Sequence, residues 1–350
     1  MTSSVFSWTE NLELLESNHD LGTERIQWSM REILDGRADI SQIKAFLMAL
    51  KTKGESAEDV GALVEEMYRH AAPINIPERA VDTVGTGGDV AHPIKISTPA
   101  AIIAAAAGAR VVKHGNRAAT SRSGAADLLE ALGVAIMLNG TQVEECVAQL
   151  GIGFCFAPMF HPAMRHASPA RKELGVPTVF NILGPLANPA QPKAAAIGVA
   201  NEKMLPIMAQ VLAKRGVDGF VFRGDDGLDE ITLTTSTTVL TIGNGEVAYS
   251  SIDPRDFGMV HSPLSEIVGG DPDQNAQITT AIFAGERGAP RDAVVLTAAA
   301  AIAAFRGDEH LSVVERMSRG VVEAASAIDG GGAKDLLARW VELSQKLSMS

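Results

Sequence analysis

The chain has 350 residues, 46% of them hydrophobic and 21% charged, and its formal net charge is -12 at pH 7. This composition is typical of a soluble globular protein, and a chain of this length favours two domains because one hydrophobic core seldom exceeds about 250–300 residues. The acidic balance argues against nucleic-acid binding, which normally needs a basic surface. We therefore expect any phosphate site to be a local basic pocket.

The cysteine content and the lack of long apolar runs indicate the cellular compartment of the protein. Cys146 and Cys155 do not have the spacing of a metal site, and two cysteines do not make a disulfide scaffold. Residues 1–10 lack the pattern of a secretory signal, and the longest nearly apolar run, 293–305, falls short of the roughly 20 residues of a membrane span. We expect a cytoplasmic protein with no membrane partner.

Residues 8–70 show apolar side chains at helical spacing throughout. Asp39 is placed to cap one helix, and Ser56 with Asp59 approximates a capping box for the next. Gly36 is expected to end a helix. The pattern predicts a small all-helical N-terminal domain.

From about residue 78, short β-branched runs alternate with alanine-rich helical stretches. This alternation predicts βαβ units and a mostly parallel central sheet flanked by helices, so the fold class is α/β. Residues 1–77, with about 167–190, should form the small helical domain, and 78–166 with 191–350 should form the large domain. Strands are expected over 80–84, 109–112, 195–199, 219–223 and 232–242, and helices over 99–107, 124–132, 292–305 and 311–325.

Three polar segments follow predicted strands and could carry chemistry. The first, Gly85–Asp89, precedes a helix that should open at Thr98, as a phosphate loop would. It matches neither a P-loop nor a dinucleotide fingerprint, and glycine turns after strands are common. Asp89 would repel phosphate, which suggests a contact with ribose or with metal-bound water.

The second segment, 113–123, combines Lys113, Arg117 and Arg122 with hydroxyl side chains. A solvated polar loop is the alternative, but this mixture favours anion binding. By itself, His114 fits a hydrogen-bonding neighbour better than a catalyst.

The third segment, 224–230, gathers carboxylates that suit Mg²⁺ held against substrate phosphates. A solvated acidic turn is the alternative, and the presence of all three segments favours the metal. His161 and His166 lack a carboxylate partner at zinc spacing, and no serine hydrolase, zincin or thioredoxin motif occurs. Together the segments predict a site for a small molecule with several phosphates.

These segments closely resemble those of the anthranilate phosphoribosyltransferases of tryptophan synthesis. The resemblance runs from about residue 20 to 345. The matching stretches are 82–89, 113–117, 123–133, 156–158, 165–166, 180–186 and 227–230.

The resemblance implies a homodimer of the nucleoside phosphorylase type of fold, with the small helical domain of residues 1–77 and about 167–190 mediating dimerisation. It also implies a reaction in which the amine of anthranilate displaces pyrophosphate from C1 of phosphoribosyl pyrophosphate (PRPP), giving N-(5-phosphoribosyl)-anthranilate. Mg²⁺ is the implied cofactor, with two ions per active site.

The family's functional residues carry over by position. Catalysis is assigned to Lys113, Asp229 and Glu230, and metal binding to Ser97, Asp229 and Glu230. Anthranilate is assigned to Gly85, His114, Asn116, Pro158 and Arg171, with Arg171 facing its carboxylate. PRPP is assigned to Gly85, Gly88, Asp89, Lys95, Ser97, Thr98, Lys113, His114, Gly115, Asn116, Arg117, Ala118, Ala119, Thr120, Ser121 and Ala125.

One stretch departs from the family pattern, at residues 90–95, where a small polar loop and an Asn are usual. Lys95 either adds a cation near the pyrophosphate or displaces the usual amide contact. The alternatives are a pyrimidine nucleoside phosphorylase, whose Lys-His-Ser-Thr-Gly-Gly motif differs here, and a non-catalytic nucleic-acid-binding paralogue. The Rossmann-like phosphoribosyltransferases lack support, because no acidic pair precedes a Thr-Thr-Gly loop.

Overall fold

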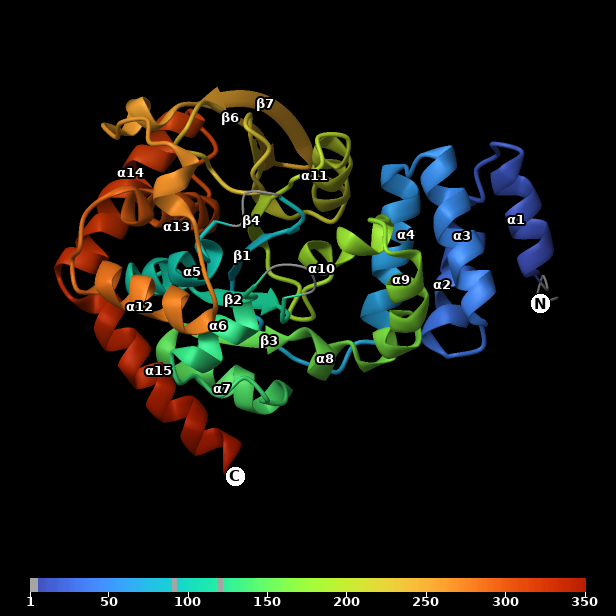
Figure 1. Cartoon of the computed structure of the whole chain (residues 1–350), viewed down its shortest axis with the longest axis horizontal. Helices are drawn as coiled ribbons and strands as arrows, with labels where there is room; N and C mark the ends of the chain where they lie inside the picture. Colours follow the sequence, from blue (N-terminus) through green and yellow to red (C-terminus); the bar gives the residue numbers. More distant parts are fainter. Residues whose placement is uncertain (1–5, 90–92, 119–121) are drawn as a thin grey trace.

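The computed structural model describes residues 6–89, 93–118 and 122–350. A small group of helices packs beside a larger unit built on one sheet (Figure 1). This arrangement confirms the predicted fold class. None of the helices within the described residues is long and apolar enough to cross a membrane.

The N-terminal helices follow the capping signals of the sequence. They are α1 (Trp8–Glu16), α2 (Gly22–Leu34), α3 (Ile40–Lys53) and α4 (Ala57–Arg69). Asp39 and Gln42 form a reciprocal capping box at the start of α3, and Ser56 and Asp59 form another at the start of α4. The predicted caps are confirmed, and each supplies acceptors for backbone N–H groups that the helix leaves free.

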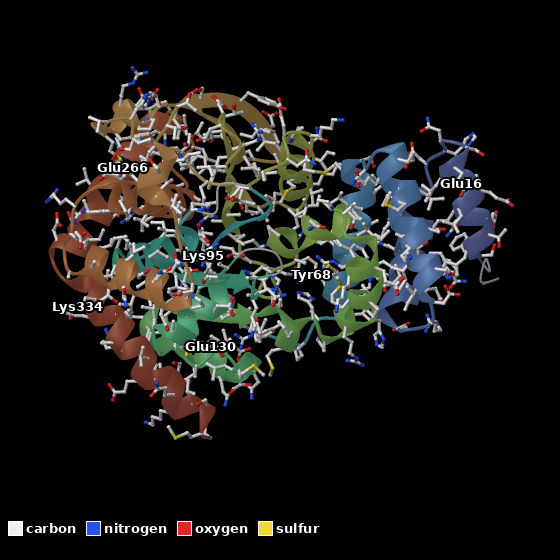
Figure 2. All side chains as sticks on the ribbon, in the orientation of Figure 1. Glu16, Tyr68, Lys95, Glu130, Glu266 and Lys334 are labelled. Atoms are coloured by element: carbon white, nitrogen blue, oxygen red, sulfur yellow. The ribbon has the colours of Figure 1, made fainter. Side chains whose placement is uncertain are left out.

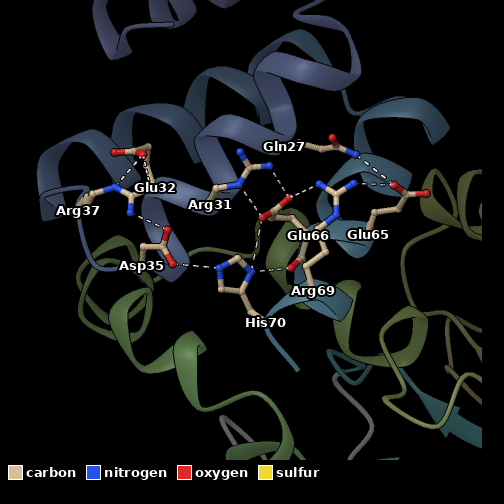
Figure 3. A network of polar contacts seen from close by, with 9 residues as sticks. All are labelled: Gln27, Arg31, Glu32, Asp35, Arg37, Glu65, Glu66, Arg69 and His70. Atoms are coloured by element: carbon tan, nitrogen blue, oxygen red, sulfur yellow. Dashed lines mark hydrogen bonds and ion pairs between the residues drawn. The ribbon is translucent and has the colours of Figure 1, made fainter. Parts of the chain in front are cut away.

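A buried carboxylate joins two of these helices. Glu66 on α4 is 1% exposed and accepts two hydrogen bonds from Arg31 on α2, at 2.9 and 3.1 Å. Arg69 donates to the same carboxylate at 2.9 Å, and His70 Nδ1 donates to the Glu66 carbonyl (Figure 3). The charge of Glu66 is therefore paired, which a buried carboxylate requires.

The larger unit is built on a seven-stranded sheet with the order β3-β2-β1-β4-β5-β6-β7. The first five strands pair in parallel, and β6 and β7 extend the sheet beyond β5 as an antiparallel hairpin. The sheet is mostly parallel, as predicted. Its strands are β1 (Val81–Gly85), β2 (Val111–Gly115), β3 (Ile152–Phe156), β4 (Ala194–Gly198), β5 (Asp218–Gly224), β6 (Thr237–Gly243) and β7 (Glu246–Ile252).

The strand predicted over 232–242 is wrong at its start, because β6 begins only at Thr237. The hydroxyls of Thr232 and Thr234 both donate to Asp226 Oδ2, at 2.6 and 2.5 Å, and so fold this stretch into a turn. Side-chain bonds of this kind compete with strand pairing. The prediction also missed two strands, β3 and β7. In β7 most side chains are exposed, so that strand gives little hydrophobic signal.

Helices cover both faces of the sheet. The alanine-rich α13 packs against α5 and α14, and small side chains allow this close approach. The helices of this unit are α5 (Ser97–Ala106), α6 (Ala125–Ala131), α7 (Gly140–Leu150), α8 (Ala157–Phe160), α11 (Met204–Lys214), α12 (Pro272–Phe283), α13 (Ala289–Arg306), α14 (Val313–Asp329) and α15 (Gly332–Ser348), with 3-10 turns η1 (Pro162–His166), η3 (Pro254–Phe257) and η4 (Leu264–Ile267).

The segment after η1 passes beside the N-terminal helices and then enters the sheet (Figure 1). Here α9 (Ser168–Leu174) packs on α3, and η2 (Val179–Asn181) leads to α10 (Leu183–Leu186), which packs on α4. Tyr68, labelled at this junction in Figure 2, donates to the Leu186 carbonyl at 2.7 Å. Arg215, directly after α11, donates to the same hydroxyl at 2.6 Å and so connects α4 to a helix that packs on the sheet.

Candidate active site

The three polar segments follow strands whose carboxyl ends lie at one edge of the sheet. β1 and β2 end at Gly85 and Gly115, and β5 ends at Gly224. Because these strands are parallel, the segments that leave them meet at the same edge. This edge is where ligands bind in open parallel sheets.

The first and third segments touch through Gly85 and Asp229. A β-carbon on Gly85 would lie 2.2 Å from Asp229 Oδ2, and one on the neighbouring Gly198 would lie 1.8 Å from the Asp229 carbonyl oxygen. The backbone N–H of Gly87 donates to Asp229 Oδ2 at 2.6 Å. Gly87 and Gly88 have φ angles of +70° and +92°, a conformation that favours glycine. These glycines allow the loop to lie against the acidic pair.

The acidic pair is buried among other charges. Asp229 and Glu230 are 6% and 8% exposed. Burial raises the pKa of Asp229 well above its usual range, and a hydrogen bond with the Asp89 carboxyl raises it further. Burial raises the pKa of Glu230 to about 7, against the opposing charges of Lys113 and Lys95. Carboxylates held this close favour either a shared proton or a bound cation.

The donor set fits a hard divalent cation held partly by a substrate. Asp229 and Glu230 offer oxygen ligands, and Thr297 donates to Glu230 Oε2 at 3.3 Å, which orients that carboxylate. No group of three or more His, Cys, Asp or Glu side chains in the described ranges forms a preformed metal site. Mg²⁺ usually takes one or two carboxylates and completes its shell with water and substrate phosphates.

Lys113 is a buried lysine on β2 whose ammonium contacts both β1 and the start of α5. It is 1% exposed, and its ammonium donates to the Thr83 carbonyl and to Ser97 Oγ, the latter at 3.2 Å. Burial lowers the pKa of Lys113, while the charges of Asp82 and Glu230 oppose that shift. The cation thus lies between the start of α5 and the acidic pair.

His114 has one ring nitrogen without a partner. Its Nδ1 lies 2.9 Å from the Gly184 carbonyl and must donate there, which leaves Nε2 as a buried acceptor with no hydrogen bond among the described residues. Burial lowers the pKa of His114 to about 3, and the ring of His161, edge-to-face at 5.2 Å, adds to the effect. His114 is therefore neutral at physiological pH.

The second segment is held in shape by α6. Asp127 Oδ2 accepts from the backbone N–H of Ala118 at 3.0 Å and of Gly124 at 2.8 Å, so one carboxylate holds both ends of the loop. Arg117 is directed at Asp127 and Glu130 on α6. The Arg117 side chain is therefore paired with two carboxylates in this structure and is not free to bind an anion. Ala119, Thr120 and Ser121 lie outside the described residues.

The helix after the first segment starts at Ser97, one residue before the predicted opening at Thr98. Thr98 is 1% exposed, and its Oγ1 has no hydrogen-bond partner in the described part of the chain. Lys95 lies near Glu230, since its charge lowers the pKa of that carboxyl. Lys95, labelled within the outline of the larger unit in Figure 2, is half-buried, and its backbone N–H donates to Asn275 Oδ1 on α12 at 3.2 Å.

The predicted anthranilate residues lie on three elements. Asn116 follows β2, and its Oδ1 accepts from the Arg117 backbone N–H at 2.7 Å. Pro158 is exposed on α8, directly after β3, the strand that pairs with β2. Arg171 is half-buried on α9, burial lowers its pKa, and its guanidinium has no hydrogen bond or ion pair with another described residue. No such bond joins Arg171 to Asn116 in these ranges.

Two buried polar residues that support the site were given no role by the sequence. Asp82 accepts from the His114 backbone N–H at 3.2 Å, and from Asn188 Nδ2 at 2.8 Å. Asn188 also donates to the Val112 carbonyl at 2.7 Å. These bonds connect β1 and β2 to the loop between α10 and β4, where Asn188 lies. A carboxylate inside an apolar strand is the one signal that could have identified Asp82.

Comparisons with known proteins agree with this architecture. Residues 10–71 match the helical bundle domain of a glycosyl transferase family, and residues 77–334 match its a/b domain. The structure of the anthranilate phosphoribosyltransferase of Thermus thermophilus is 38% identical, with a TM-score of 0.87, over 96% of this chain and 99% of that one. A Saccharomyces cerevisiae enzyme in complex with PRPP and Mg is 27% identical, with a TM-score of 0.87, over 97% and 98%.

Curated relatives are closer in sequence. The anthranilate phosphoribosyltransferase of Rhodococcus jostii is 50% identical over 98% of this chain and 95% of its own length. That of Saccharopolyspora erythraea is 50% identical over 99% of each chain. Two domain matches in order, near-complete coverage and half of all residues identical show common descent. The chain belongs to the anthranilate phosphoribosyltransferase family.

Proposed function

We propose that this chain transfers the phosphoribosyl group of PRPP to the amine of anthranilate and releases pyrophosphate. The observation that carries the proposal is the contact between the Gly85–Asp89 segment and Asp229, where the Gly87 N–H donates across 2.6 Å. That contact brings a glycine loop suited to phosphates and a buried carboxylate pair suited to a cation to one place. Membership of the family supports the same reaction.

The donor would lie along the three segments at the sheet edge. Gly85, Gly88 and Asp89 of the first segment would contact the donor, and backbone N–H groups at the start of α5 would face its phosphates, whereas the Gly87 N–H is already bonded to Asp229. Thr98 Oγ1, which has no partner among the described residues, would supply a further hydrogen bond. The remaining proposed ligands are Lys95, Ser97, Lys113, His114, Gly115, Asn116, Arg117, Ala118, Ala119, Thr120, Ser121 and Ala125.

Mg²⁺ would be held by Ser97, Asp229 and Glu230, directly or through water, and we propose two ions per site. The related Saccharomyces cerevisiae structure is a complex with PRPP and Mg. When bound, the ion would neutralise the charge that builds up on the leaving pyrophosphate. Lys113, buried beside Ser97, would hold a second positive charge close to the same place.

The acceptor side needs no strong base. The amine of anthranilate is neutral and offers its lone pair without first losing a proton, so positioning suffices for the attack. Once the C1–N bond has formed, the acidic ammonium nitrogen releases its proton to water or to the departing pyrophosphate. His114, whose pKa is lowered to about 3, is neutral and would not protonate that amine. Arg171 would pair with the anthranilate carboxylate, while Gly85, Asn116 and Pro158 would line the site.

The proposal extends to organisation. Residues 1–77 with about 167–190 would form the dimerising helical domain, and 78–166 with 191–350 the PRPP-binding domain. The packing of α9 on α3 and of α10 on α4 supports this division. We further propose a cytoplasmic homodimer. The pyrimidine nucleoside phosphorylase alternative gains no support, since the curated relatives named above are anthranilate phosphoribosyltransferases.

The test is the fluorescence of anthranilate on mixing the purified chain with PRPP. We expect the fluorescence to fall with Mg²⁺ present and to remain when Mg²⁺ is chelated. Pyrophosphate should appear in equal amount. Unchanged fluorescence with both substrates and Mg²⁺ would overturn the proposed reaction.

A further inference from the structure

A second basic site lies at the end of the sheet opposite to the three polar segments. There Arg79, just before β1, pairs with Asp218 at the start of β5 at 2.9 Å. Its Nε and Nη2 also donate to the carbonyls of Phe305 and Ala304 at the end of α13, at 2.8 and 3.0 Å. The end of α13 therefore lies at the amino ends of the strands, far along the sheet from Gly85.

Arg316, on α14, is buried beside this corner. Burial lowers its pKa, and the charges of Glu309, Asp308 and Asp218 oppose that shift, although no described carboxylate lies within ion-pair distance of it. It is 4% exposed, and among the described residues it has no ion pair. Its Nη2 donates weakly to the Ala303 carbonyl at 3.4 Å, and its Nε has no partner. The guanidinium lies over the Phe220 ring at 4.5 Å, which offsets part of the cost of burial. A buried arginine normally has carboxylate partners, so this one is exceptional.

Arg316 lines a pocket of about 200 Å³ between α13 and α14. Arg306 and Arg319 line it too, with exposed side chains, as do Asp308 and Glu323. Arg306 pairs with Glu323 at 2.6 Å, and Arg319 lies 3.7 Å from Asp308. Among the residues that line the pocket, three arginines stand against two carboxylates, and the buried Arg316 has no ion-pair partner within the described residues; Glu309, outside the lining, also acts on its charge.

We infer that this pocket binds a small oxyanion, a phosphate or a carboxylate group, whose oxygens accept hydrogen bonds from the guanidinium of Arg316 and from those of Arg306 and Arg319. A planar guanidinium donates to two oxygens of such a group at once. The volume admits a small ligand and is well below the roughly 300–1,000 Å³ of pockets for drug-sized molecules. The inference is independent of the proposed reaction, because none of these residues belongs to the candidate active site.

The test is titration calorimetry of the full chain with sodium phosphate and, separately, with sodium acetate at low ionic strength. We expect Arg316→Lys, which loses the planar fork, to weaken binding about tenfold, and Arg319→Gln to weaken it severalfold. Glu323→Gln should tighten binding, since it frees Arg306. Heat with phosphate alone assigns a tetrahedral anion, and heat with acetate alone assigns a carboxylate.

Arg287→Gln is the matched control, because it removes an exposed arginine outside the pocket and changes the net charge equally. It should leave binding unchanged, so that any phosphate bound at the sheet edge contributes equally to every sample. Circular dichroism checks that each variant folds; if Arg316→Lys does not, Arg319→Gln and Glu323→Gln decide. Isotherms of Arg319→Gln and Glu323→Gln that match the unmodified chain overturn the inference, as does the absence of heat with both anions.

Discussion

Gly85 and Asp229, 144 residues apart in the sequence, lie so close that a β-carbon on Gly85 would stand 2.2 Å from Asp229 Oδ2. No real contact is that short, so any side chain at residue 85 must displace the carboxylate. The hydrogen bond from the Gly87 N–H to the same oxygen would be lost with it. Local backbone geometry at one strand end thus fixes the position of the acidic pair.

Gly85→Ala should therefore lower kcat/KM by about a hundredfold, the cost of misplacing a reacting group by about 1 Å. Gly61→Ala is the matched control, because its β-carbon would meet nothing within 4 Å and its backbone is that of α4. That variant should keep full turnover. Steady-state assays with anthranilate and PRPP check both, and equal activities would contradict the steric argument.

Asp229→Asn combined with Glu230→Gln should abolish Mg²⁺-dependent turnover and leave the chain folded. The pair is buried, and its neutral analogues keep the shape while losing the anionic ligands. Asp225→Asn is the control, since that carboxylate is exposed in the same turn and accepts from Ser236 and Thr238. Turnover is measured across a Mg²⁺ titration. Undiminished activity of the double variant would contradict the metal assignment.

Arg171→Ala should raise the KM for anthranilate about tenfold, as expected for the loss of one charge-assisted hydrogen bond, with little change in the KM for PRPP. The side chain has no protein partner among the described residues and is free to meet a carboxylate. Lys172→Ala, the next residue on α9 and exposed, should change neither value. Equal increases in both KM values for Arg171→Ala would remove its proposed role.

Asp82 should make the stability of the ligand-free chain depend on pH. Burial raises its pKa from 3.8 to about 6, so the native state holds the proton more tightly than the unfolded chain. That stabilisation is complete below pH 3.8 and is lost as pH rises through 6, a difference of about 3 kcal/mol in the free energy of unfolding. Urea unfolding at pH 4 to 7 should show this slope reduced in Asp82→Asn. Equal slopes would contradict the assignment.

Glu66→Ala should destabilise the helical part by about 1–3 kcal/mol, because buried hydrogen bonds to two arginines are lost. Glu65→Ala, one residue away on α4, removes an exposed carboxylate 3.8 Å from Arg69 and should cost less than about 0.5 kcal/mol. Native-state hydrogen exchange of the α2 and α4 amides measures both. Similar protection in the two variants would show that the buried Glu66 carboxylate stabilises the helices no more than the exposed Glu65 carboxylate does.

Local signals predicted much of the fold correctly. Asp39, Ser56 and Asp59 cap helices as the sequence indicated, since a cap depends on residues three positions apart. Four of the five parallel strands were identifiable as short apolar runs, and β3 was missed. Thr232 was placed in a strand because its residue type favours one, but the carboxylate of Asp226 folds it into a turn. Propensity gives way where a side chain competes for the local hydrogen bonds.

The sequence by itself determined the family, the α/β class and the three segments that follow strands, because each is written in adjacent residues. Only the tertiary structure decided that Gly87 donates to Asp229, that Lys113 is buried beside Ser97, and that Arg117 pairs with α6 instead of standing free. Those facts depend on which strands are neighbours and on how deeply a charge is buried. Strand order and burial are properties of the packed chain, and no spacing along the sequence encodes them directly.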